Sequence, residues 1–187
     1  MKGKKAFSFY LLLLFMMTGC GYQFGGSSLA DRYCSMSVPF VEGDRDGSFT
    51  AELVKRVSTS TSFDFEKEGG NLILLVKILD FGDNNIGFRY DRDSEGKLLR
   101  TIIPAETRTN MIAEVQVVDA NSGEIVVGPT RISAYVDYDH EYYSSRDGVN
   151  IFSLGQLTDF YEAHDAMYHP LNIALSQKIV DYINNSW

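Results

Sequence analysis

An acidic segment in the middle of the chain has residue types and spacing that could bind a metal ion. The run Asp91-x-Asp93-x-Glu95-Gly96 begins like a calcium-binding loop, in which carboxylate oxygens at alternate positions surround the ion. The twelfth position of that pattern is Ile102, where the loop requires a bidentate glutamate. We therefore interpret this segment as a solvated hairpin loop, with calcium binding as the alternative.

The histidines offer two further candidates for metal chemistry. His140 lies among Asp137, Asp139 and Glu141, but alternation along a strand would separate these side chains. His164 and His169 are five residues apart, whereas two ligands on one helix face need a spacing of four. The chain also lacks a Gly-x-Ser-x-Gly elbow, a phosphate loop and a Cys-x-x-Cys motif. We expect a protein that is not an enzyme and needs no cofactor or metal.

The residue with the clearest chemistry is Cys20. Lysines at positions 2, 4 and 5 precede an apolar stretch over 6–17, and Thr18-Gly19 leads into the cysteine. This arrangement is typical of a secretory signal peptide, and the apolar stretch is too short to span a bilayer. The ending resembles a bacterial lipobox, which predicts a signal peptide over 1–19 and a lipidated, palmitate-bearing Cys20. An ordinary signal peptide with an incidental cysteine is the alternative.

A lipidated Cys20 would anchor the mature protein to a membrane without spanning it. Each buried lipid methylene contributes about 0.8 kcal/mol, so several chains together hold stably. Gly21 follows the cysteine in place of the aspartate that retains lipoproteins in the inner membrane. We therefore expect an outer-membrane lipoprotein on the periplasmic side.

Charge and cysteine content narrow the classes of partner. After residues 1–19 are removed, 14 basic and 25 acidic residues remain, which gives a net charge of −11. Such an acidic protein is unsuited to nucleic acid as a partner. Cys34 is the only other cysteine, so acylation of Cys20 would leave it without an intrachain partner. We expect Cys34 to be a small buried residue of a strand.

Apolar periodicity predicts the elements that position these residues. A Gly- and Ser-rich tether over 20–32 leads into one domain over 33–187. Within it we expect strands over 33–41, 71–81, 97–119 and 125–138, a helix over 48–60 with Ser48 as its N-cap, and a final helix beginning at Pro170. The segment 82–96 is expected to be a loop, and 139–169 an insert.

The strand expected over 71–81 is apolar on both faces. Leu75 and Phe81 are expected on the face opposite Leu74. A strand of this kind is usually covered on both sides, by loops or by a partner protein. The element order β-α-β-β-β-α predicts an α+β fold: a two-layer sandwich with a four-stranded mixed sheet and two helices packed on one face.

Several motifs in this order resemble the LPS-assembly lipoprotein LptE family. They are Cys20-Gly21-Tyr22, the strand ending Ser37-Val38-Pro39-Phe40, the hairpin Asp119-Ala120-Asn121-Ser122-Gly123-Glu124, and the closing helix over 174–183. The resemblance covers about 20–138 and 170–187; the insert has no counterpart in it. It implies a plug and partner of the outer-membrane β-barrel LptD that assists lipopolysaccharide transport to the cell surface.

Two arginines are candidates for contact with lipopolysaccharide phosphates. Arg108 and Arg131 both lie on strands that we expect to pair, although scattered solubilising charge is the alternative for each. A lipoprotein activator of a peptidoglycan synthase is the competing function, because it also joins a Val-Pro-Phe-like strand to a helix. A lipid-anchored hydrolase is disfavoured because no nucleophile or metal constellation is present.

Overall fold

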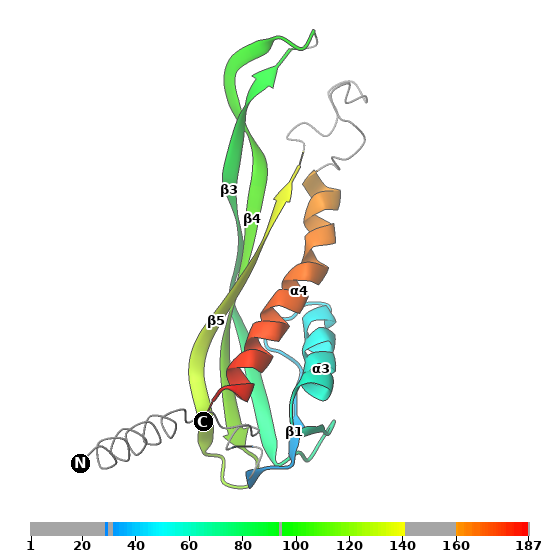
Figure 1. Cartoon of the computed structure of the whole chain (residues 1–187), viewed down its shortest axis with the longest axis vertical. Coiled ribbons are helices and arrows are strands. Elements are labelled where there is room, and N and C mark those ends of the chain that lie inside the picture. The colour runs from blue at the N-terminus through cyan, green and yellow to red at the C-terminus, as the bar shows by residue number, and fades with distance from the viewer. Residues whose placement is uncertain (1–28, 30–31, 94, 141–159, 187) are drawn as a thin grey trace, which may run out of the picture.

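The computed structural model describes residues 29, 32–93, 95–140 and 160–186 (Figure 1). Its elements follow the order β1 (Ser35–Ser37), α3 (Ser48–Ser60), β2 (Asp64–Phe65), β3 (Leu72–Arg92), β4 (Leu98–Asp119), β5 (Ile125–Asp139) and α4 (Phe160–Asn184). Cys20, the tether up to Ser28, and the insert residues 141–159 lie outside the described residues.

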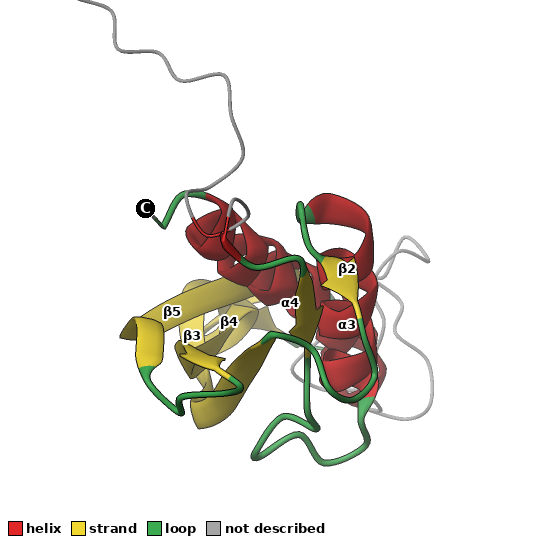
Figure 2. Ribbon diagram, turned by 90° about the horizontal axis from the view of Figure 1, so that it is seen from below, coloured by secondary structure: helices red, strands yellow, loops and turns green. Residues whose placement is uncertain are grey.

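The strands form one mixed sheet in the order β2-β1-β3-β4-β5. β1 runs parallel to β2 and β3, and β3, β4 and β5 are antiparallel to one another. Both helices lie on the same side of the sheet (Figure 2). The predicted α+β sandwich with its helices on one face is confirmed. The sheet has five strands rather than four, because the short β2 pairs with the free side of β1.

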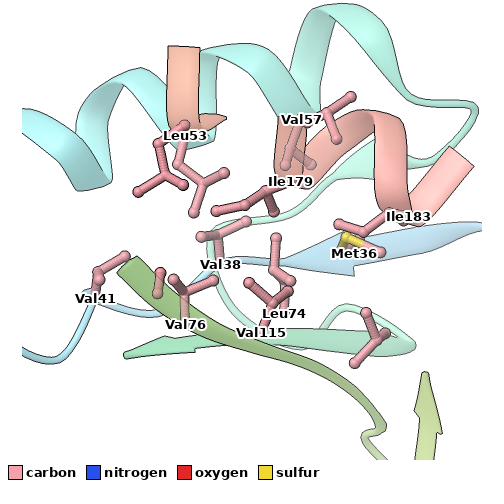
Figure 3. Packing of buried hydrophobic residues seen from close by; sticks show 14 of the residues in the cluster. Met36, Val38, Val41, Leu53, Val57, Leu74, Val76, Val115, Ile179 and Ile183 are labelled. Atoms are coloured by element: carbon pink, nitrogen blue, oxygen red, sulfur yellow. The ribbon is translucent and has the colours of Figure 1, made fainter. Parts of the chain in front are cut away.

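The core fills the space between the two helices and the sheet. Leu53 and Val57 of α3 and Ile179 of α4 point toward Leu74 and Val115 of the sheet (Figure 3), and all five are fully buried. Burying one such side chain stabilises the fold by about 1.5–3 kcal/mol. The helix predicted over 48–60 and the strand predicted over 97–119 therefore both contribute to the core.

Glu52 lies on the buried side of α3, whereas a solvent-facing position would be usual for a glutamate. Only 8% of its side chain is exposed, and its carboxylate accepts hydrogen bonds from Lys55 and Arg56, each at 3.0 Å. Burial alone would raise the pKa of this carboxyl, but the two cations outweigh it and hold the pKa below its ordinary value. The two ion pairs keep the buried carboxylate of Glu52 charged.

The start of α3 is capped differently from the prediction. Ser48 is the first helical residue, and the N-cap position belongs to Gly47, whose φ of 78° suits glycine. The side chain of Asp44 takes over the capping role by accepting hydrogen bonds from the backbone N–H of Gly47 and Thr50. A carboxylate at this end also complements the helix dipole.

The first strand is shorter than predicted, and the alternation of buried and exposed side chains does not continue to its predicted end. β1 stops at Ser37, and Phe40 is 65% exposed instead of sharing a buried face with Met36. Ser35 and Ser37 of β1 are buried because β2 and β3 pair with the two sides of this strand. Ser37, for example, donates to the carbonyl of Leu72 on β3 at 3.3 Å.

The final helix begins ten residues before the predicted start. α4 runs from Phe160, so Pro170 lies inside it. A proline there removes one backbone hydrogen bond and disfavours the helix by about 3 kcal/mol. Buried residues on both sides, Met167 and Leu171 among them, hold the two segments against the sheet. Neither described helix is both long and apolar enough to cross a bilayer.

Candidate functional site: an uncovered sheet face

The sheet face opposite the helices is called here the outer face, and most of the large apolar residues that are exposed in the described part of the chain lie on it. In the described parts of α3 and α4, none of the large apolar residues is exposed. Phe40 lies outside the long strands and Phe81 lies on the helix side; the others belong to β3, β4 or β5: Leu75, Leu79, Ile86, Phe88, Tyr90, Leu98, Ile102, Ile125 and Tyr135. Exposed apolar patches of this kind mark surfaces that bind partners.

A β-bulge at Leu79 sets which residues of β3 reach the outer face. Ile78 pairs with Ala113 and Phe81 pairs with Met111, both on the helix side, while Leu79 is the unpaired extra residue. Phe81 therefore stacks on Tyr168 of α4, with ring centroids 5.4 Å apart. The prediction that Phe81 shares a face with Leu75 and Leu79 is wrong, because the bulge reverses the alternation after Ile78.

Polar side chains join the upper part of the sheet to α4 on the helix side. The carboxylate of Asp83 lies 3.3 Å from His164 Nε2 and accepts a hydrogen bond from Thr109. His140 is buried, with its Nε2 2.8 Å from the hydroxyl of Thr107. Of these contacts, the one between Asp83 and His164 joins the sheet to α4, in addition to the apolar core.

Arg108 lies on the outer face and is already engaged by neighbouring side chains. Its guanidinium donates two hydrogen bonds to Asp137, at 2.6 and 2.7 Å, and lies 4.1 Å from the ring centroid of Tyr135. The hydrogen bonds from Arg108 hold the pKa of Asp137 below its ordinary value, and those same bonds raise the pKa of Arg108. A phosphate could bind Arg108 closely only by sharing it with Asp137.

Arg131 lies on the same face at some distance from Arg108. It pairs in register with Glu114 of β4, which is six positions along the strand from Arg108. At about 3.4 Å per residue, the two arginines are separated by roughly 20 Å. The structure therefore places both predicted phosphate contacts on the outer face but does not bring them to one site.

The part of β3 and β4 farthest from the helices, over Ile86–Arg92 and Leu98–Pro104, is called here the distal hairpin. The prediction of a loop over 82–96 is wrong, because β3 continues to Arg92 and the turn closes where Asp93 N–H donates to the carbonyl of Lys97. The Asp, Asn and Gly residues of 82–87 obscured the strand. The alternation of Ile86, Phe88 and Tyr90 could have revealed it.

The candidate metal ligands are dispersed. Asp91 is buried near the end of β3, and Asp93 caps the hairpin turn by accepting hydrogen bonds from the backbone N–H of Glu95 and Lys97. Among the residues that the structure describes, no three His, Cys, Asp or Glu side chains come together as a metal site. Glu141 lies outside this part of the chain.

One further expectation concerns a single residue. Cys34 is exposed, so the prediction of a buried cysteine is wrong; it precedes β1 instead of lying inside it. A separate irregularity lies at Gly128-Pro129 of β5, where the register shifts between Val115 and Val117 of the facing strand. Gly128 has φ 86° and approaches Val115 so closely that a Cβ would lie 2.5 Å from its carbonyl oxygen.

Comparison with known proteins yields structural neighbours but no family. No protein-family model matches the chain, and no curated protein matches it in sequence. The solved structures that it resembles include bacterial lipoproteins.

Three of these structures illustrate the degree of likeness. A minor lipoprotein from Acinetobacter baumannii is 12% identical over 82% of this chain and 94% of its own, with a TM-score of 0.47. The rare lipoprotein B from Shewanella oneidensis is 12% identical over 80% and 92%, with a TM-score of 0.48. Lipoprotein B from Nitrosomonas europaea is 12% identical over 81% and 83%, with a TM-score of 0.47.

Proposed function

We propose that this protein is a lipid-anchored outer-membrane protein that docks its outer face against the LptD barrel and assists lipopolysaccharide delivery. The role needs no catalysis and no cofactor. The observation that carries the proposal is the apolar surface of a sheet that the described helices cover on one side only. Two features of the sequence support it further: the lipobox-like segment ending at Cys20 and the resemblance to the LptE family.

The outer face mixes exposed apolar side chains with polar ones, among them Lys77, Glu114 and Arg131. Antiparallel sheets that face water usually carry polar residues on that side. Here Leu75, Leu79 and Tyr135 are each more than a third exposed, and Ile112 lies between them on β4. Covering these side chains would remove apolar area from water and stabilise a complex at roughly 25 cal/mol per Å² before the costs of association.

The Arg108–Asp137 pair gives that face a rigid polar centre. Arginine and tyrosine are the residue types that most often dominate binding energy, and here Tyr135 and Arg108 stack on each other. Because Asp137 holds the guanidinium in place, little side-chain freedom remains to be lost when a partner covers it. We therefore assign Tyr135 and Arg108 as the centre of the docking face.

The docking proposal is tested by gentle detergent extraction of the native membrane followed by pull-down of the full chain. We expect an outer-membrane barrel to co-purify, and we expect the double variant Leu75→Ser with Tyr135→Ser to lose it. The matched control, Leu75→Met with Tyr135→Phe, keeps the apolar surface and should retain the barrel. Recovery of a peptidoglycan synthase alone would support the activator role instead and overturn the proposal.

The lipopolysaccharide contact is tested separately from docking. Replacing Arg108 and Arg131 together by glutamate should weaken lipopolysaccharide binding by the protein, because both positions would then repel phosphate. The pair Arg108→Lys and Arg131→Lys is the control, since it preserves the positive charge. Unchanged lipopolysaccharide binding by the glutamate variant would remove these two arginines from the proposal without affecting the docking face.

A further inference from the structure

The distal hairpin differs from the rest of the outer face in both shape and charge. β3 is 21 residues long, which corresponds to roughly 70 Å of extended strand. Its upper end, together with β4, projects beyond both helices (Figure 1). A surface that meets this end of the molecule would therefore contact the hairpin before it contacted α3 or α4.

Apolar side chains gather on one side of the distal hairpin through cross-strand pairing. Tyr90 pairs with Ile102, Phe88 pairs with Pro104, and Arg92 pairs with Leu98, so these residues share the outer face. Tyr90, Ile102, Phe88 and Leu98 are each more than half exposed. Aromatic and aliphatic side chains presented together on a hairpin end suit the boundary between lipid headgroups and acyl chains, where the hydroxyl of a tyrosine stays hydrated.

The hairpin and its turn carry four basic residues against three acidic ones, so this end is slightly positive in an acidic protein; the residues are Arg89, Arg92, Lys97 and Arg100 against Asp91, Asp93 and Glu95. Arg92, Lys97 and Arg100 are exposed around the apolar side chains, although the mature chain carries a net charge of −11. In the described part of the chain, none of the three forms an ion pair with a carboxylate; Arg92 donates to the carbonyl of Gly96 at 2.8 Å. Asp93 is occupied with backbone N–H groups of the turn. Three cations beside an apolar surface favour an anionic layer of lipid.

We propose that the distal hairpin is a membrane-contact element that rests its outer face on the surface of an anionic phospholipid bilayer. Phe88, Tyr90, Leu98 and Ile102 would enter the headgroup region, and the three basic residues would lie among the lipid phosphates. This contact is additional to the lipid anchor expected at Cys20 and goes beyond the proposed docking of the outer face. It makes the hairpin a second point of attachment, at the far end of the sheet.

The experiment places a tryptophan reporter at the hairpin in the full mature chain. Trp187, the only native tryptophan, is replaced by phenylalanine, and Tyr90→Trp is introduced. The protein is reconstituted with vesicles of phosphatidylglycerol and phosphatidylcholine containing lipids with brominated acyl chains, and quenching of fluorescence is measured. Tyr135→Trp is the matched control, because it is a similarly exposed position of the outer face away from the hairpin.

We expect the reporter at position 90 to shift to the blue and to be quenched in anionic vesicles, with quenching that falls as salt is raised. It should be quenched much less in vesicles of phosphatidylcholine alone. Replacing Arg92, Lys97 and Arg100 by glutamate should reduce quenching in anionic vesicles to that neutral level. The reporter at position 135 should stay unquenched in both.

Three outcomes would overturn the proposal. They are equal quenching at positions 90 and 135, no quenching at either, and quenching at position 90 that the glutamate variant leaves unchanged. An unchanged thermal unfolding curve for each variant confirms that the hairpin has not been lost. No barrel is present in this assay, so its failure is distinguishable from failure of the pull-down.

Discussion

Adjacent leucines of β3 provide a direct test of the division between the two sheet faces. Leu74 is fully buried under the helices, whereas Leu75 points to the outer face and is 37% exposed. Leu74→Ala would leave a cavity in the core and should lower the free energy of unfolding by about 3 kcal/mol. For a protein of this size, that loss lowers the melting temperature by roughly 6–12 °C.

Leu75→Ala should have little effect on the isolated protein but a measurable effect on its complex. Burying a whole leucine is worth about 1.5–3 kcal/mol, so covering the exposed 37% of Leu75 is worth about 0.6–1.1 kcal/mol. The variant should then bind the proposed barrel partner roughly three- to sevenfold more weakly. Thermal unfolding and quantitative pull-down measure the two effects side by side.

Specific results would refute this reasoning. If Leu75→Ala lowered the melting temperature as much as Leu74→Ala, the outer face would be part of the core. If it left both the melting temperature and the complex unchanged, Leu75 would not lie in an interface. Urea unfolding can separate the cases further, because a cavity variant should change the midpoint without changing the dependence on denaturant.

Other predictions concern the base of the sheet. Tyr33 donates a hydrogen bond to Asp119 at 2.8 Å and holds the pKa of that carboxyl below its ordinary value. The resulting stability should be present above about pH 4 and lost as the pH falls through the lowered pKa, so urea unfolding should show Asp119→Asn differing from the native chain at pH 7 and converging with it in acid. A Cβ on Gly70 would lie 2.6 Å from the backbone nitrogen of Ser37, so Gly70→Val should lower the melting temperature by loosening β1. Cys34 is exposed and should react with a thiol reagent in the native protein, as counted by mass spectrometry.

The sequence predicted α3 and the part of β4 that faces the helices well, because apolar residues recur there with the simple periods of a helix and a strand. Phe49, Leu53 and Val57 recur every four residues and all three are buried on α3. Val115 and Val117 alternate with polar neighbours and face the helices. In these segments, local pattern and tertiary packing agree.

The part of β3 beyond Leu79 was predicted wrongly, because its residue types are unusual for a strand. Asp83 and Asn85 are poor strand formers, yet Thr109 and Thr107 of β4 provide partners for their side chains. The bulge at Leu79 then moved Phe81 to the helix side, a change that strict alternation cannot reveal. Pairing with β4 decided both outcomes. The alternation of Ile86, Phe88 and Tyr90 indicates a strand, but the sequence of β3 alone does not contain the position of the bulge.

The two faces of the sheet separate the residues that stabilise this protein from those that we propose carry its function. Side chains such as Leu74 and Val115 are buried by the chain's own helices, so changing them should affect every property of the protein together. Side chains such as Leu75 and Tyr135 have no described helix over them, so changing them should affect only what a partner covers. A set of variants drawn from the outer face can therefore map the interface without the loss of folding that would otherwise confuse the measurement.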